Sequence, residues 1–415
     1  MLSEIDVNKF TNRNKKMRLR HGVLKHLIAA LLILYCIGII VTLSNEKKRF
    51  QWDFSTYYYA GKAYSAGLNP YDAEVLSQMA TTPVNQFVYT PLSLPVLRLF
   101  STLDFKPAFY FFLSLKLIIL IGLLYLWKRE FLKSDADLLF YVFCLFGFNS
   151  AIYIDIRSGN ISIFEQGVLW LAFAAFLRNK LLLFCILTTL AATFKIQPIL
   201  ILVLLGYSNV QSKYRYLFAT VFLIVGIHFI SYIMHPGFFK DFISQVTNLD
   251  CRGINAPSTL ALLRDIHDTL SRKGILVISP TAIYLAIVVT ILAVTGWALK
   301  SPEKIIDKRI ILFTICLTYA LILPRFKIYS YILLLVPSYF MIKNVFSKTS
   351  IPILIILLMF SQHTMLPGFN KLSEYFLWRY YPLIMTYCIW SLSVIAIFQR
   401  RTGLNQLRIS EKNSK

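Results

Sequence analysis

Long apolar runs separated by short basic clusters dominate this 415-residue sequence. Hydrophobic residues make up 57% of the chain and charged residues only 15%, against roughly 45–50% and about 25% in soluble domains. A helix needs about 20 apolar residues to cross the hydrocarbon core, where it can satisfy all of its own backbone groups. The sequence therefore predicts an all-α polytopic membrane protein.

Roughly twelve apolar segments are predicted to be spans. They are Leu24–Leu43, Lys106–Trp127, Leu138–Ile154, Ile161–Leu177, Leu181–Phe194, Ile196–Gly206, Tyr214–Met234, Ile275–Leu299, Arg309–Leu323, Tyr329–Ile342, Ile351–Leu366 and Tyr380–Phe398. Lys195 and Pro198 interrupt one apolar run, so two short helices are predicted to meet there. Because two prolines and Arg98 interrupt Phe87–Leu103, this stretch is predicted to lie on the membrane surface.

The basic clusters predict the orientation of these spans. The net charge is +23, but the basic residues lie between apolar runs rather than on one face, which follows the positive-inside rule and does not indicate a nucleic-acid partner. The predicted organisation is a cytoplasmic basic N-terminus (1–23), a membrane module (24–398) with an outer loop (44–105), and a cytoplasmic tail (399–415). We expect a multi-pass protein of the plasma (inner) membrane with its active site on the extracytoplasmic face.

The first outer loop contains the most distinctive stretch, Gln51–Tyr71, with the sequence QWDFSTYYYAGKAYSAGLNPY. It predicts an amphipathic helix of about three turns that ends at Gly67 and lies on the membrane, since tyrosine and tryptophan prefer the headgroup level. Asp53 at its start is a candidate general base that could accept a proton from a bound hydroxyl. Tyr57 and Tyr58 could stack on a sugar. The alternative for Asp53 is a solvated loop carboxylate.

Cations on the predicted outer face are candidates for holding a phosphate. Lys195 lies where two short helices would meet, although it could also be a lysine that extends to the interface. Arg325 and Lys327 follow Pro324 against the charge bias, and Tyr329 could cover a lipid or sugar beside them. Arg157 beside Asn160, and Arg264 near Asn255, form weaker groups of the same kind. Asn160, Asn255 and Arg264 are candidates for binding the acceptor or its sugar.

Glu165 is a second candidate carboxylate, since it lies inside an apolar run. A charge there costs about 2.5–3.5 kcal/mol on insertion scales. A structural ion pair is the alternative to a catalytic role, and is favoured.

Several motifs are absent from the sequence. There is no phosphate-cradling glycine loop, no acidic pair for a metal-held nucleotide sugar and no nucleophile elbow. An enzyme of this kind would draw its donor from the membrane, with no metal or cofactor. The alternatives are a transporter or flippase of lipid-linked sugars, and a polymerase or ligase of surface polysaccharide.

A series of motifs, taken together in chain order, resembles glycosyltransferase family 87. They are W-D-F-x-x-Y-Y-x-A-G (Trp52–Gly61), G-x-N-P-Y-D (Gly67–Asp72), F-V-Y-T-P-L (Phe87–Leu92), G-N (Gly159–Asn160), F-K-I-Q-P (Phe194–Pro198), N-A-P-S (Asn255–Ser258) with L-L-R after it, and P-R-F-K-I-Y-S-Y (Pro324–Tyr331). The best-known members are polyprenol-phosphate-mannose-dependent α-mannosyltransferases and related arabinosyltransferases. The resemblance covers roughly residues 24–345.

This resemblance implies a GT-C fold that takes sugars from polyprenyl phosphate and transfers them to a glycan or glycolipid acceptor. The catalytic aspartate of the family carries over onto Asp53, and the lysine of the K-x-x-P break onto Lys195. Near the late outer segment this chain has Arg325, Lys327 and Tyr329 where the mannosyltransferases have an aromatic and histidine stretch. The resemblance therefore does not indicate which sugar is transferred.

Overall fold

The computed structural model describes residues 51–208, 210–275, 278–300, 307–345 and 376–413, with Ala30, Ile33, Ile37, Val41 and Ile355 as isolated positions. Every regular element in these ranges is helical, which confirms the predicted class. The predicted spans Leu24–Leu43 and Ile351–Leu366 lie almost wholly outside the described residues.

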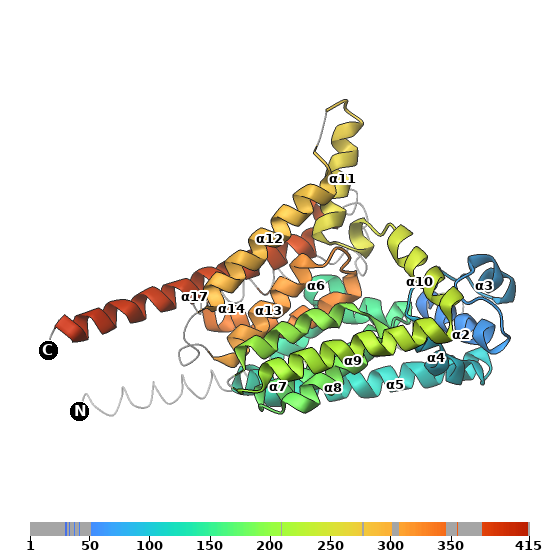
Figure 1. Cartoon of the computed structure of the whole chain (residues 1–415), viewed down its shortest axis with the longest axis horizontal. Coiled ribbons are helices and arrows are strands. Elements are labelled where there is room, and N and C mark those ends of the chain that lie inside the picture. Colours follow the sequence, from blue (N-terminus) through green and yellow to red (C-terminus); the bar gives the residue numbers. More distant parts are fainter. Residues whose placement is uncertain are drawn as a thin grey trace, which may run out of the picture.

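Membrane-length helices form the body of the molecule (Figure 1). Five stretches of the described chain are long and apolar enough to cross a membrane: Phe105–Asp135, comprising α5 (Phe105–Leu126), η3 (Trp127–Leu132) and η4 (Lys133–Asp135), then α6 (Leu138–Ser158), α9 (Lys213–Met234), α12 (Pro280–Leu299) and Tyr381–Gln399 within α17 (Tyr381–Asn413). Shorter helices lie among them: α7 (Ser162–Leu177), α8 (Leu181–Phe194), η5 (Gln197–Tyr207), α13 (Lys308–Ile322), η7 (Ile328–Leu334) and α14 (Leu335–Val345). Helices α5, α7, α8 and α9 run side by side.

Apolar side chains on the outside of this bundle point to a lipid surround. Phe218 and Phe222 of α9 are 71% and 80% exposed, and Ile121 of α5 is 68% exposed. A soluble monomer rarely leaves so much contiguous apolar surface uncovered. In a membrane the same surface contacts lipid tails.

Short helices gather at one end of the bundle: α2 (Trp52–Ser65), α3 (Ala73–Met79), η2 (Pro91–Ser93), α4 (Leu94–Ser101) and α10 (Pro236–Asn248). Segment Phe87–Leu103 forms only η2 and α4 at this end, so it is not a long span, as predicted. Helix α11 (Thr259–Ser271), preceded by η6 (Gly253–Asn255), projects from the bundle beside α12, and α16 (Phe376–Arg379) leads into α17.

Helix α2 is largely buried in protein, so its aromatic side chains pack on other helices rather than on lipid headgroups. All residues from Phe54 to Gly61 are buried. The Phe54 ring packs on Phe112 of α5 with centroids 4.9 Å apart, and the Tyr58 hydroxyl donates to the Leu103 carbonyl at 2.9 Å. The aromatic residues that suggested an interface are instead the core of this end of the molecule.

Two glycines allow α2 to approach its neighbours. A Cβ on Gly61 would lie 2.6 Å from the Leu97 carbonyl oxygen of α4, and a Cβ on Gly159 would lie 2.3 Å from Oε1 of Gln51. Gly159 ends α6 in the left-handed conformation, with φ at +68°, which favours glycine. The chain then turns directly into α7, so the α6–α7 junction lies against the start of α2.

Candidate active site

Asp53 and Asn160 meet at this junction. Asp53 lies in the first turn of α2, where the helix dipole favours a carboxylate. Asn160 lies between α6 and α7, and its Nδ2 donates to Oδ2 of Asp53 at 2.7 Å. The same amide lies 3.1 Å from the Tyr57 hydroxyl and 3.4 Å from the Tyr89 hydroxyl. The sequence identified three of these residues separately, and the fold brings them together.

Asn160 is held in place from both sides. Its Oδ1 accepts hydrogen bonds from the backbone N–H of Ser162 at 3.0 Å and from the Ser162 hydroxyl at 2.8 Å, forming an Asx turn at the start of α7. Its backbone carbonyl accepts from Nζ of Lys116 at 2.7 Å. Lys116 lies on α5 and is fully buried.

The Lys116 ammonium has three partners, which match its three protons. Besides Asn160, it donates to the Asp155 carbonyl at 2.7 Å and pairs with Oδ1 of Asp155 at 2.6 Å. A buried charge is tolerated only when it is paired and hydrogen-bonded in this way. The pair therefore fixes the end of α6, and with it Asn160, beneath Asp53.

A cavity of ≈ 370 Å³ opens over Asp53, a volume typical of small-molecule sites. Its wall includes Tyr57, Tyr89, Asn255, Lys327 and Tyr329. We call it the Asp53 cavity. Asn255, which the sequence placed with the acceptor, thus lies on the same cavity as the candidate base.

Burial raises the pKa of the Asp53 carboxyl above its ordinary value. The charge of Lys327, the hydrogen bond from Asn160 and the charges of Lys116 and Lys195 act in the opposite direction. Burial also raises the pKa of Tyr57 well above its ordinary value and that of Tyr89 to about 12. Both phenols stay protonated at neutral pH, so Asp53 is the residue of this group that can accept a proton.

A second cavity, of ≈ 390 Å³, shares lining residues with the first, among them Tyr89, Lys327 and Tyr329. Lys195, Arg325 and Lys327 all line this second cavity, which we call the Arg325 cavity. The ammonium nitrogens of Lys195 and Lys327 lie 5.9 Å and 5.7 Å from the centroid of the Tyr329 ring. Three cations around one cavity suit an anionic ligand.

Lys195 lies at the predicted break between two short helices. Helix α8 ends at Phe194, η5 begins at Gln197, and Lys195 itself is extended. Its Nζ pairs with the carboxylate of Glu165 and donates to the Ser162 hydroxyl at 3.2 Å. The structural ion pair considered for Glu165 is therefore present.

An apolar groove of ≈ 260 Å³ begins at the same lysine. It lies between α4, α5, α7 and α8, and residues such as Val96, Val168, Leu190 and Phe194 line it. Among the described residues, Glu165 and Lys195 are its charged lining residues. Phe194 and Lys195 also line the Arg325 cavity. The apolar groove and the cationic cavity therefore meet at Phe194 and Lys195.

A loop between α10 and α11 (249–258) covers both cavities. Leu249 lines both, and Cys251 lines the Asp53 cavity. The Arg325 guanidinium donates to the carbonyls of Val246, at 2.9 Å, and Leu249. Arg325 thus anchors this loop in addition to lining the cavity.

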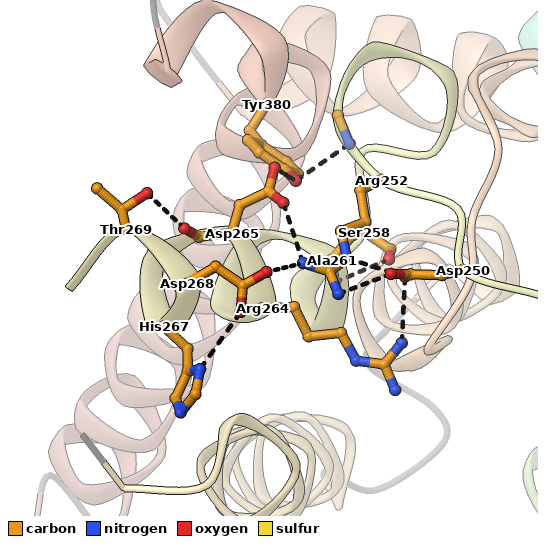
Figure 2. A network of polar contacts seen from close by, with 11 residues as sticks. Asp250, Arg252, Ser258, Ala261, Arg264, Asp265, His267, Asp268, Thr269 and Tyr380 are labelled. Atoms are coloured by element: carbon orange, nitrogen blue, oxygen red, sulfur yellow. Dashed lines mark hydrogen bonds and ion pairs between the residues drawn. The ribbon is translucent and has the colours of Figure 1, made fainter. Parts of the chain in front are cut away.

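Ion pairs connect the 249–258 loop to α11, and a hydrogen bond connects it to Tyr380 (Figure 2). Arg252 pairs with Asp250, Asp265 and Asp268, while the backbone N–H of Gly253 donates to the Tyr380 hydroxyl at 3.1 Å. Arg264 lies 3.4 Å from Oδ1 of Asp250.

Four predicted site residues line none of the three cavities: Asn160, which contacts Asp53 from the α6–α7 junction, and Arg264, Tyr58 and Arg157. Arg264 belongs to the network of Figure 2, Tyr58 packs in the core of the short-helix end, and Arg157 lies on α6 without lining a cavity. Conversely, sequence reasoning missed Tyr89, Lys116, Asp155 and Ser162. Lys116 and Asp155 gave a signal, since opposite charges inside or at the end of neighbouring spans usually pair.

Comparison with family models matches residues 87–324 to glycosyltransferase family 87. This chain belongs to that family. It is a membrane glycosyltransferase, and its helical bundle is of the GT-C type expected from the sequence. The matched stretch includes Tyr89, Asn160, Lys195 and Asn255 but begins after α2, so it does not extend to Asp53. No curated protein and no solved structure matches the chain.

Proposed function

We propose that this glycosyltransferase transfers a sugar from a polyprenyl-phosphate donor to a glycan or glycolipid acceptor, with inversion at the anomeric carbon and Asp53 as the general base. One observation carries the proposal: a carboxylate and a group of cations line two cavities that share one wall, formed by Tyr89, Lys327 and Tyr329. A single displacement needs a base on one side of the sugar and a stabilised leaving group on the other.

The acceptor hydroxyl would bind in the Asp53 cavity, where Tyr57 and Asn255 can contact its sugar. Asp53 takes the hydroxyl proton, the acceptor oxygen bonds to the anomeric carbon, and the bond from that carbon to the phosphate oxygen breaks. The electron pair of that bond stays on the polyprenyl phosphate. A positioned base of this kind contributes typically about 10²–10⁴-fold.

The leaving phosphate would bind in the Arg325 cavity, near Lys195 and Lys327. These cations neutralise the charge that develops on the phosphate, so the leaving group needs no general acid. The co-substrate supplies the chemistry, and the proposed reaction needs no metal or other cofactor. The isoprenoid chain would follow the apolar groove from Lys195 between α4 and α8 to the lipid.

The reaction would take place on the extracytoplasmic face of the plasma (inner) membrane, with both termini in the cytoplasm. The basic clusters support this orientation. Lys62 and Lys128 are both exposed, so Lys62→Cys and Lys128→Cys form a matched pair for an impermeant thiol reagent. Lys62→Cys should be labelled in intact cells and Lys128→Cys only after permeabilisation, whereas the reverse would overturn the topology.

The decisive experiment compares Asp53→Asn with Asp72→Asn in purified protein. Both changes keep the side-chain shape, and Asp72 is an exposed carboxylate of the same outer loop that caps α3. A panel of radiolabelled polyprenyl-phosphate sugars is used to measure donor binding and single-turnover transfer. Asp53→Asn should lower transfer by at least about a hundredfold with donor binding retained, while Asp72→Asn should change neither.

Retained transfer in folded Asp53→Asn protein would remove Asp53 from the catalytic role. If the unmutated protein transfers none of the sugars but moves an intact lipid-linked sugar across a vesicle membrane, the transporter alternative replaces the proposal. Transfer of a whole lipid-linked glycan chain, rather than one sugar, would instead indicate a polymerase or ligase.

A further inference from the structure

A continuous line of hydrogen bonds connects the two cavities through the protein interior. Lys195 donates to the Ser162 hydroxyl at 3.2 Å, Ser162 donates to Oδ1 of Asn160 at 2.8 Å, and Nδ2 of Asn160 donates to Asp53 at 2.7 Å. The line thus starts at a cation of the Arg325 cavity and ends at the carboxylate of the Asp53 cavity. Ser162 is its middle member and lines neither cavity.

The direction of every bond in this line is fixed by chemistry. An ammonium can only donate and a carboxylate can only accept. Lys195 donates to a lone pair of the Ser162 hydroxyl oxygen. The single proton of the Ser162 hydroxyl is therefore directed to Oδ1 of Asn160. Nδ2 of Asn160 therefore faces Asp53. Ser162 and Asn160 are 0% and 1% exposed, so water does not compete for these bonds, and bonds in such a line strengthen one another.

We propose that Ser162 is a positioning residue that couples the Lys195 ammonium to the Asp53 carboxylate through the side chain of Asn160. This inference rests on the proposed function, in which Lys195 serves the donor phosphate and Asp53 the acceptor. Ser162 keeps the Asn160 amide oriented so that Asp53 is aimed and ionised when the acceptor hydroxyl arrives. Lys116 holds the backbone of Asn160 from below, whereas Ser162 holds its side chain.

The pH dependence of transfer distinguishes this role from a merely structural one. The groups that act on Asp53 come from several elements: Asn160, Lys116 of α5, Asp155 of α6, Lys195 after α8, Lys327 before η7, and the hydroxyls of Tyr57, Tyr89 and Tyr329. The bond from Asn160 lowers the pKa of Asp53. Loosening that bond must raise this pKa, so the acid limb of the pH–rate profile moves to higher pH.

The test compares Ser162→Ala with Ser158→Ala. Ser158 is equally buried, but its hydroxyl donates to the Asp155 carbonyl, outside the line. Ser162→Ala should lower kcat at neutral pH by about fivefold to tenfold, the value of one hydrogen bond, with the donor KM unchanged and less loss at high pH. Ser158→Ala should keep the natural pH profile. An unshifted acid limb in folded Ser162→Ala protein would overturn the proposal.

A second measurement needs no transfer activity, so it separates this inference from the proposed function. Ionised Asp53 costs stability, because its pKa is raised in the folded protein. Asp53→Asn should therefore raise the melting temperature in detergent at neutral pH, and should raise it more in the Ser162→Ala background than in the Ser158→Ala background. Equal gains in both backgrounds would refute the coupling, even if every donor proved inactive.

Discussion

Two networks of charged side chains lie close to the cavities, and water reaches only one of them. In the network beneath Asp53, the side chains of Lys116 and Asp155 are 1% and 0% exposed, whereas Arg252 and Asp250 in the network of Figure 2 are 30% and 47% exposed. Burial makes each contact in the first network necessary, since a lost partner leaves an unpaired charge without solvent. In the second network, solvent can replace a lost partner, so the loss of one contact costs little stability.

The two networks also shift carboxylates in opposite directions. Burial raises the pKa of Asp53, whereas the Arg252 hydrogen bond holds the pKa of Asp250 below its ordinary value. Asp53 therefore lowers stability progressively as the pH rises from its unfolded pKa through its raised folded pKa. Asp250 stabilises the fold above its unfolded pKa, and this contribution is lost as the pH falls through its folded pKa. The buried network therefore holds its carboxylate at a cost in stability, whereas the exposed network stabilises the 249–258 loop.

Asn160→Asp should have the largest effect, because it places a second carboxylate in the buried network. Oδ1 can still accept from Ser162, but the other oxygen would lie beside Oδ2 of Asp53 in place of a donor. Two such carboxylates share one proton, which raises the pKa of the pair. Single-turnover transfer at neutral pH should fall at least about a hundredfold. A variant that transfers normally would show that Asp53 does not act as the base.

Lys116→Met tests, through the free energy of unfolding, whether Asp155 needs its buried partner. It leaves Asp155 charged and unpaired, so the free energy of unfolding should fall by about 3–5 kcal/mol. The double variant Lys116→Met/Asp155→Asn removes both charges and should regain most of this loss. Thermal unfolding in detergent measures both proteins. If the double variant were no more stable than the single one, the ion pair would not explain the cost.

Lys327→Gln tests the electrostatic balance at Asp53 with a milder change. Lys327 is the positive charge that lowers the pKa of Asp53 most. Without it this pKa rises, so the acid limb of the transfer profile should move to higher pH, with activity recovering as the pH increases. The control is Lys62→Gln, which removes an exposed lysine of α2 that lines no cavity. An identical acid limb in Lys327→Gln and Lys62→Gln would show that the charge of Lys327 does not lower the pKa of Asp53.

Arg252→Gln should have the smallest effect. Asp250 keeps its contact with Arg264, and Tyr380 still holds Gly253 and Asp265 (Figure 2). Transfer should change within about twofold, as expected for exposed ion pairs, and adding salt to the natural protein should reproduce the change. A loss comparable to that of Asn160→Asp would mean that the two networks are not distinct.

Hydropathy and charge were sufficient to predict the helical class, helices at the predicted spans in the described ranges, and the break at Lys195. Five of these helical stretches are long and apolar enough to cross a membrane. Hydropathy and charge could not predict the burial of α2, because its aromatic residues suit a membrane interface and a protein core equally well. Asp53 and Asn160 were each identified, yet their contact depends on the α6–α7 junction meeting α2, which no local pattern encodes. Tyr89 and Ser162 were missed because a hydroxyl gains its role only from its neighbours.

The outer segments show the same limit. Arg325 was predicted to hold a phosphate, and it also anchors backbone carbonyls of the 249–258 loop. Arg264 and Asn255 were grouped because they are close in sequence. The structure separates them, with Asn255 on the Asp53 cavity and Arg264 in the exposed network.

Gly61 and Gly159 carry no charge and no polar side chain, yet the packing around α2 leaves them less freedom than the ionised residues of Figure 2. Even the single carbon of alanine would meet the Leu97 carbonyl at one position and Gln51 at the other. In terms of mutational tolerance, these two positions accept no larger side chain unless the backbone or side chains around them shift. A charged or polar side chain can be replaced by an isostere without a change in packing, whereas no residue is smaller than glycine.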